Sequence, residues 1–274
     1  MNGGYLPGVR GAPTFPNLYN EGKAGGGYDV KIPKKGAPLY LQFKIPQIVT
    51  RSSGKCPPGF IQPYYRMHLM RRKHSLQHQS LLTHARRGRL VFYSSPTFHI
   101  TDDLNRFYGN REVPLNSVFV NPNMIGPLTD EPHHVAYPST GKEAWLCSAP
   151  VQLDGHIDFE HFLSDLRQNL SVGRRKDTNA QFFKDLAEEI IQTLKSTVLQ
   201  AERQARERPS KQRDEFSPAW QLGYEESSEA RAERIENRSR EQFHLLLDRF
   251  PLPAAVGYMA RFYLDCELII MGSE

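Results

Sequence analysis

Three residues near the N-terminus, Asp29, Gln42 and Lys44, have side chains that together suit the cleavage of a phosphodiester bond. Such cleavage needs charge neutralised on the phosphate and a water molecule activated in line with the leaving group, and a divalent cation does both. Asp29 is a natural carboxylate ligand for that cation, and Gln42 can offer an amide oxygen directly or through water. Lys44 can orient the attacking water and offset the charge that develops on phosphorus.

The segments that carry these residues predict a pair of strands. Residues 28–32 and 39–45 have strand patterns, and the Pro- and Gly-containing residues 33–38 between them predict a turn. Side chains two positions apart on a strand share a face, so Gln42 and Lys44 are expected to point the same way. A hairpin would bring the aspartate of the first strand beside them.

Two further groups can extend this metal site. The backbone carbonyl oxygen of Phe43 can add a ligand, and Glu21, at the end of a short helix expected over 16–23, can complete an outer shell or bind a second ion.

Each residue of this group also has a purely structural interpretation. Asp29 follows a run of glycines and can cap a turn. Gln42 can be a solvent-facing polar residue on a strand, and Lys44 can protect an edge strand from pairing with other chains. The sequence leaves both sets of interpretations open.

The N-terminal elements are expected in the order helix, strand, strand, strand, helix, strand. The third strand is expected at 64–70, and Ser75 is a good N-cap for a helix over 76–86 that Gly88 ends. The fourth strand is expected at 90–93. Shorter elements follow at 102–108, 118–120 and 135–137.

Asp29 followed by Gln42-Phe43-Lys44, in the segment LYLQFKI, resembles the PD-(D/E)xK superfamily of restriction-endonuclease-like nucleases in its Gln-x-Lys form. The preceding EGKAGGGYD is similar to the family's segment in which a glutamate precedes the metal-binding aspartate. The resemblance covers roughly residues 14–95. It implies an α/β fold with an αβββαβ core and a mixed central sheet, and Mg²⁺- or Mn²⁺-dependent cleavage of DNA. Such families are common in bacterial restriction and antiphage defence.

A cluster of basic residues follows the predicted metal site. Residues 66–89 contain seven Lys or Arg residues and four histidines, with no acidic residue. Such a cluster is typical of a phosphate-binding face, although it can also be a solvated surface without a partner. The candidates for contact with nucleic acid are Arg71, Arg72, Lys73 and His78. For His78 alone, a structural role is the competing interpretation.

The composition changes after about residue 150. Helices are expected over 158–170, 178–206 and 226–248, followed by an apolar segment at 252–271. We therefore expect a nuclease-like α/β domain over 1–150 and a helical domain over 151–274 that regulates activity or binds a partner. The apolar stripe from Phe182 to Val198 can be either core or a surface for a partner subunit.

The overall composition excludes several other classes. The 274 residues, with 39% hydrophobic and 24% charged side chains, argue against disorder throughout. Three widely spaced cysteines indicate neither a zinc site nor a disulfide framework. No nucleophile elbow, P-loop or dinucleotide fingerprint is present. With no signal-peptide pattern and no apolar run of about 18 residues, the expected location is the cytoplasm, without a membrane partner.

The sequence thus predicts a metal-dependent nuclease that cleaves DNA, with RNA as an open alternative substrate. One rival is a catalytically inactive protein that binds nucleic acid, because Gln42 stands where the superfamily usually has an acidic residue. Another rival is an adaptor subunit that works through its helical half in a larger complex. The resemblance also implies that the protein can act as a homodimer, because many nucleases of this type pair up to cut both strands.

Overall fold

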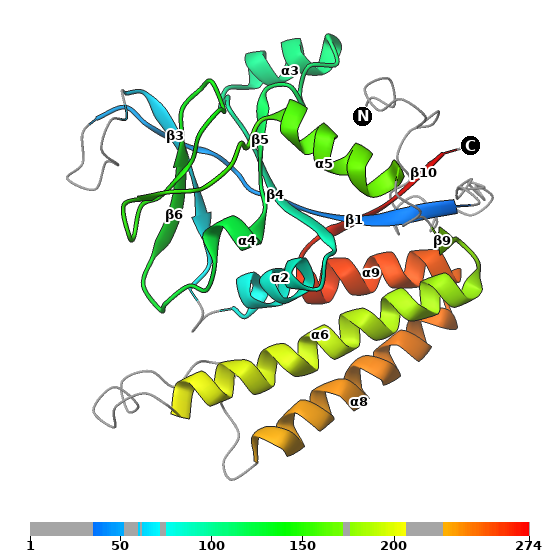
Figure 1. The fold of residues 1–274 in the computed structure, drawn as a ribbon. Coiled ribbons are helices and arrows are strands. Elements are labelled where there is room, and N and C mark those ends of the chain that lie inside the picture. The colour runs from blue at the N-terminus through cyan, green and yellow to red at the C-terminus, as the bar shows by residue number, and fades with distance from the viewer. Residues whose placement is uncertain are drawn as a thin grey trace.

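The structure, a computed structural model, describes the following residues: 35–51, 60, 62–71, 75–171, 176–206 and 227–273. They form two five-stranded sheets and a set of helices (Figure 1).

The first sheet is mixed. It consists of β1 (Lys35–Phe43), β4 (Leu90–Pro96), β5 (Ser117–Val120), β9 (Lys176–Asp177) and β10 (Glu267–Ser273). Its order is β10-β1-β4-β5, with β9 paired to the start of β1. Strand β1 runs parallel to β4 and antiparallel to β10, and β5 runs antiparallel to β4.

The second sheet is antiparallel. It consists of β2 (Gln47–Val49), β3 (Tyr64–Leu69), β6 (His133–Tyr137), β7 (Trp145–Leu146) and β8 (Val151–Gln152), paired in that order. Strand β3 was expected as the third strand of the nuclease-like core. It lies instead in this second sheet, because its two neighbours there are β2 and β6.

Helices cover both faces of the first sheet. One face is covered by α2 (Gln77–Arg86), α6 (Ala180–Arg206) and α9 (Leu252–Leu264), with α8 (Ser228–Leu247) packed on α6 (Figure 1). The other face is covered by α5 (Phe159–Ser171). The short helices α3 (Thr101–Gly109) and α4 (Pro122–Ile125) follow β4 and β5. An α/β fold with a mixed sheet and C-terminal helices is therefore confirmed.

Strand β1 is buried on both faces. Leu39 and Leu41 face a cluster that includes Phe162 of α5, whereas Tyr40 faces the larger cluster formed with α6 and α9. An apolar run of this kind is typical of a strand covered on both sides. The turn expected at 33–38 is wrong for its described part, because residues 35–38 already belong to β1 and pair with β10. The expected first strand at 28–32 lies outside the described residues.

The apolar stripe of α6 is core. Phe182, Phe183, Leu186 and Ile190 are all buried, and they pack in the same cluster as Tyr40 of β1. Residues on both sides of position 150 thus share one sheet and one hydrophobic core.

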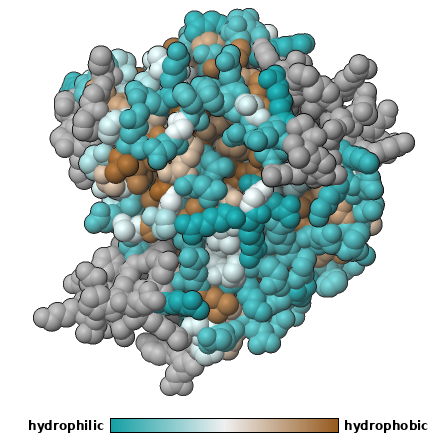
Figure 2. All heavy atoms as spheres, viewed as in Figure 1, coloured by the Kyte–Doolittle hydropathy of each residue, from teal (hydrophilic) through white to brown (hydrophobic). Residues whose placement is uncertain are grey.

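The exposed sides of the C-terminal helices are polar. Figure 2 shows a mainly hydrophilic surface at the lower right, where Figure 1 places α6 and α8. Among the described residues, no helix combines the length and the apolar character that crossing a membrane requires.

We predict that Ile190→Ala destabilises the protein by about 2–5 kcal/mol, because it leaves a cavity where α6 meets the sheet. Ile190 is fully buried. Urea denaturation followed by circular dichroism would measure the change. Lys184→Ala, at an exposed position of the same helix, is the control and is expected to change the free energy of unfolding by less than about 0.5 kcal/mol. Equal effects of the two variants would contradict the assignment of this stripe to the core.

Candidate functional site at the end of strand β1

The side chain of Gln42 is buried near the end of β1, where it is 1% exposed. Its Nε2 donates a hydrogen bond to Oδ2 of Asp265 at 3.0 Å. Its Oε1 is also buried and has no hydrogen-bond partner among the described residues. Nearly all buried polar atoms in proteins have a hydrogen-bond partner. A bound ligand that donates to this oxygen, or a cation that it coordinates, would supply the partner that it lacks.

Asp265 comes from the opposite end of the chain. It lies between α9 and β10 in the left-handed region, with a φ of 51°. Asp and Asn adopt this conformation more easily than most residues, and here it ends the helix and starts the strand. Asp265 is exposed, whereas its partner Gln42 is buried. The hydrogen bond between them therefore runs from the interior to the surface.

Lys44 lies just beyond the end of β1 and belongs to the same network. Its Nζ donates to Oε1 of Gln77 at 3.2 Å, and Nε2 of Gln77 donates to the same Asp265 oxygen. The backbone of Lys44 is fixed by hydrogen bonds to β4, from its N to Ser94 O at 2.8 Å and from Ser95 Oγ to its carbonyl at 3.0 Å. The two residues of the Gln-x-Lys motif are thus linked to one carboxylate, Gln42 directly and Lys44 through Gln77.

The ammonium group of Lys44 is half-buried. Burial lowers its pKa below the usual value, whereas Asp265 and the neighbouring Cys266 act in the opposite direction. The ammonium also lies 5.7 Å from the centre of the Tyr93 ring. Lys44 is therefore easier to deprotonate than an exposed lysine, and Asp265 helps to keep it charged.

His78 lies next to Tyr93 on the interior side of this site and is almost completely buried. Its Nε2 donates to the carbonyl oxygen of Gly126 at 2.7 Å, which leaves Nδ1 to accept from the Tyr93 hydroxyl at 2.8 Å. The ring is 6% exposed and stacks on Tyr93. Burial lowers the pKa of His78 to about 4. In this arrangement His78 is a neutral packing residue, and a contact between it and a phosphate would require both hydrogen bonds to break.

Four predicted residues lie outside the part of the chain that the structure describes: Glu21, Asp29, Arg72 and Lys73. Of the others, Phe43 exposes 54% of its surface next to Lys44. Arg71 is half-buried just after β3. The described structure therefore brings together Gln42 and Lys44 from the predicted set.

Positive charge gathers on the second sheet close to Lys44. His68 is exposed on β3, and its ring lies 5.1 Å from that of His134 on β6. Partial burial lowers the pKa of His68, and so do the charges of Lys44, Arg71 and Arg66. We call the surface formed by Arg66, His68 and Arg71 the basic face. It is near enough to Lys44 for the Lys44 charge to act on His68.

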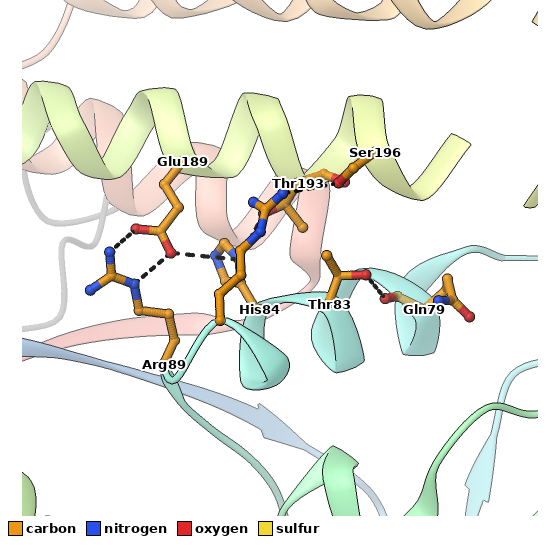
Figure 3. A network of polar contacts seen from close by, with 8 residues as sticks. Gln79, Thr83, His84, Arg89, Glu189, Thr193 and Ser196 are labelled. Carbon is orange, nitrogen blue, oxygen red and sulfur yellow. Dashed lines mark hydrogen bonds and ion pairs between the residues drawn. The ribbon is translucent and has the colours of Figure 1, made fainter. Parts of the chain in front are cut away.

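The other arginines of the basic cluster have a different role. Figure 3 shows that the end of α2 is attached to α6 by a polar network. Arg89 forms a two-point ion pair with Glu189, and His84 Nδ1 hydrogen-bonds Thr193 Oγ1 at 2.8 Å. Arg87 donates to Thr193 and Ser196. Within the basic cluster over 66–89, Arg87 and Arg89 thus link two helices, whereas the expectation of a phosphate-binding face stays a prediction.

The sequence pattern missed Asp265 and Gln77. Asp265 is an acidic residue within an apolar segment, two positions before Glu267, and such a polar interruption is a signal for a break between a helix and a strand. Nothing local connects it to Gln42, which is 223 positions away. Comparisons with models of protein families, with curated proteins and with solved structures found no match. The geometry of the site therefore carries the functional argument.

We predict that Asp265→Asn lowers the pKa of Lys44 further, because the variant removes a negative charge that favours the ammonium form. A larger fraction of the Lys44 amine is then uncharged at a given pH. Acetylation by a limiting amount of acetic anhydride, followed by mass spectrometry across a pH series, would detect faster labelling of Lys44. Exposed Lys184 serves as the internal control. Unchanged labelling of Lys44 would contradict the electrostatic coupling.

Proposed function

We propose that this protein is a nuclease that uses a divalent cation to cleave phosphodiester bonds in DNA, in a bacterial restriction or antiphage setting. The observation that carries the proposal is a hydrogen-bonded group in which Gln42 bonds Asp265 directly and Lys44 reaches it through Gln77. In the same group, the buried amide oxygen of Gln42 has no partner among the described residues. Asp29, with Glu21 as a further candidate, would supply the rest of the site.

The donor atoms in this group fit a hard cation. Asp265 offers a carboxylate oxygen and Gln42 an amide oxygen, and both are ligand types that Mg²⁺ and Mn²⁺ accept. The unpartnered Oε1 of Gln42 supports this fit, because coordination would satisfy it. When bound, the cation would neutralise charge on the phosphate and lower the pKa of a coordinated water.

The protein's own residues would position the substrate. Lys44 would place a positive charge against a phosphate oxygen, and its hydrogen bond to Gln77 limits the positions that its ammonium can take. The basic face of Arg66, His68 and Arg71 would hold the backbone of the nucleic acid beside the site. Arg72 and Lys73 remain candidates for the same role.

The second candidate function is binding of nucleic acid without cleavage. The low negative charge of the site favours this candidate. Among the described residues, Asp265 is the one carboxylate that is hydrogen-bonded to Gln42 and that acts on the charge of Lys44. A site with a single carboxylate, next to a basic face, would still attract phosphates. RNA as the bound molecule belongs to this candidate as well as to the first.

We predict that the wild-type protein cleaves plasmid and linear DNA in the presence of Mg²⁺ or Mn²⁺. Lys44→Ala, Asp29→Ala and Asp265→Asn should each reduce the rate by roughly 100-fold or more, since each removes a charge from the reacting centre. Lys184→Ala, which changes an exposed lysine on α6, should cleave as the wild type does. Folding of every variant is checked by circular dichroism. Equal rates in all variants would refute the proposed site.

We also predict that Arg71→Ala weakens binding of DNA and makes the slope of log affinity against log salt shallower by about 1, because one phosphate contact is lost. Fluorescence anisotropy of a labelled duplex at several salt concentrations measures this slope. Arg87→Ala is the matched control from the same basic cluster, since Arg87 contacts α6. If Arg87→Ala changes the slope and Arg71→Ala does not, the basic face is misassigned. Binding without cleavage would favour the second candidate function.

A further inference from the structure

A second group of side chains with ligand chemistry lies away from the candidate nuclease site. His156, Asp158 and His161 each offer one ligand atom, and these atoms all lie within 4.8 Å of one another. The group sits at the start of α5, which packs on the face of the first sheet opposite to α2 and α9 (Figure 1). It is therefore independent of Gln42, Lys44 and Asp265.

The backbone holds two of these side chains outward. Ile157 is fully buried between them, and its carbonyl oxygen accepts a hydrogen bond from the backbone N of Phe119 in β5 at 2.7 Å. Phe159, on the other side of Asp158, is buried against Phe119. Because residues 157 and 159 are anchored in the core, the alternate residues point away from it, with His156 exposed and Asp158 half-buried.

The third side chain is added by the first turn of α5. Oδ1 of Asp158 accepts hydrogen bonds from the backbone N and from Nδ1 of His161, each at 2.9 Å. The ring of His161 stacks on that of His156, with 3.9 Å between centres and 14° between planes. Partial burial raises the pKa of Asp158, but the hydrogen bonds from His161 outweigh this effect and the pKa is lower than usual. The carboxylate is therefore charged at neutral pH.

We propose that His156, Asp158 and His161 bind a divalent transition-metal ion of the zinc class, with the remaining coordination position open to water. Two imidazole nitrogens with one carboxylate oxygen suit Zn²⁺, Co²⁺ or Ni²⁺, whereas Mg²⁺ and Ca²⁺ prefer oxygen ligands. Three protein ligands with an open fourth position are typical of sites where zinc binds a small molecule or activates water.

The present spacing needs only a small adjustment for coordination. Bond lengths of about 2.0–2.1 Å in a tetrahedral zinc site place ligand atoms roughly 3.4 Å apart. The two imidazole rings must turn out of their parallel stack so that one nitrogen of each points at a common ion, and the hydrogen bond between His161 Nδ1 and Asp158 must be replaced by bonds to that ion. Both rings are exposed, so this rotation disturbs no packing of the core.

The test is a titration of the chelator-treated full-length protein with Co²⁺, followed by visible absorption, and with Zn²⁺, followed by calorimetry. The wild type is expected to bind one equivalent at this site, and excess Mg²⁺ should not displace it. His156→Ala, His161→Ala and Asp158→Asn should each weaken binding at least about tenfold, since loss of an outer-shell contact alone commonly costs that much. Asn keeps the capping ability of residue 158, so that variant should fold normally.

Two controls make the assignment specific. His244→Ala, at an exposed position on α8, should bind metal as the wild type does. Lys44→Ala should also bind normally, which separates this site from the nuclease proposal. The proposal is overturned if the wild type does not bind zinc or cobalt, or if binding is unchanged in all three ligand variants.

Discussion

The antiparallel pairing of β1 with β10 is the constraint on which the rest of the structure depends. The register runs from Lys35 opposite Ser273 to Leu41 opposite Glu267, so the end of β1 lies beside the start of β10. Asp265 precedes that start by two residues, and its left-handed backbone turns the chain out of α9. A slip of one residue would move every side chain of a strand to the opposite face of the sheet. Gln42 would then lose its only bonded carboxylate within the described residues, and the site would not form.

The second requirement is that α2 stays in place, because it carries Gln77 into the site and His78 beneath it. The polar network between α2 and α6 holds α2 in place. Its members Arg87 and Arg89 belong to the basic cluster that, in the sequence, is typical of a surface for nucleic acid. Arg89 and Glu189 are both partly buried, and a charged side chain in such a place is costly unless it has a partner of opposite charge. The pair therefore indicates a role in packing. Their pairing explains why part of a strongly basic segment contributes to packing, while Arg66 and Arg71 remain on the basic face.

Local pattern was enough to predict most elements, and long-range pairing was not. The helix expected at 76–86 is α2, and Gly88 follows it with a φ of 78°. The stripe of α6 was also found by its period, because a helix that covers a sheet must bury one face. The period of a strand, however, does not say which strand it pairs with. The place of β3 in a second sheet and the contact of Asp265 with Gln42 therefore could not be derived, whereas the shared face of Gln42 and Lys44 could.

The hydrogen bonds of the site also constrain how it would accept a cation. Asp265 Oδ2 now receives amide protons from both Gln42 and Gln77, and these two hydrogen bonds compete with a cation for that oxygen. Rotation of the Gln42 amide by half a turn would exchange the positions of its nitrogen and its oxygen. The oxygen that now lacks a partner would then face Asp265. Gln42 would then present an amide oxygen next to the carboxylate of Asp265, and these two groups would hold a cation once Gln77 also released its bond to Oδ2. A glutamate at this position would not need to rotate, but it would place a second negative charge beside Asp265 in a buried position. Gln42 avoids that repulsion. The orientations of the Gln42 and Gln77 amides then decide whether this group is a closed hydrogen-bonded network or a site with oxygen ligands.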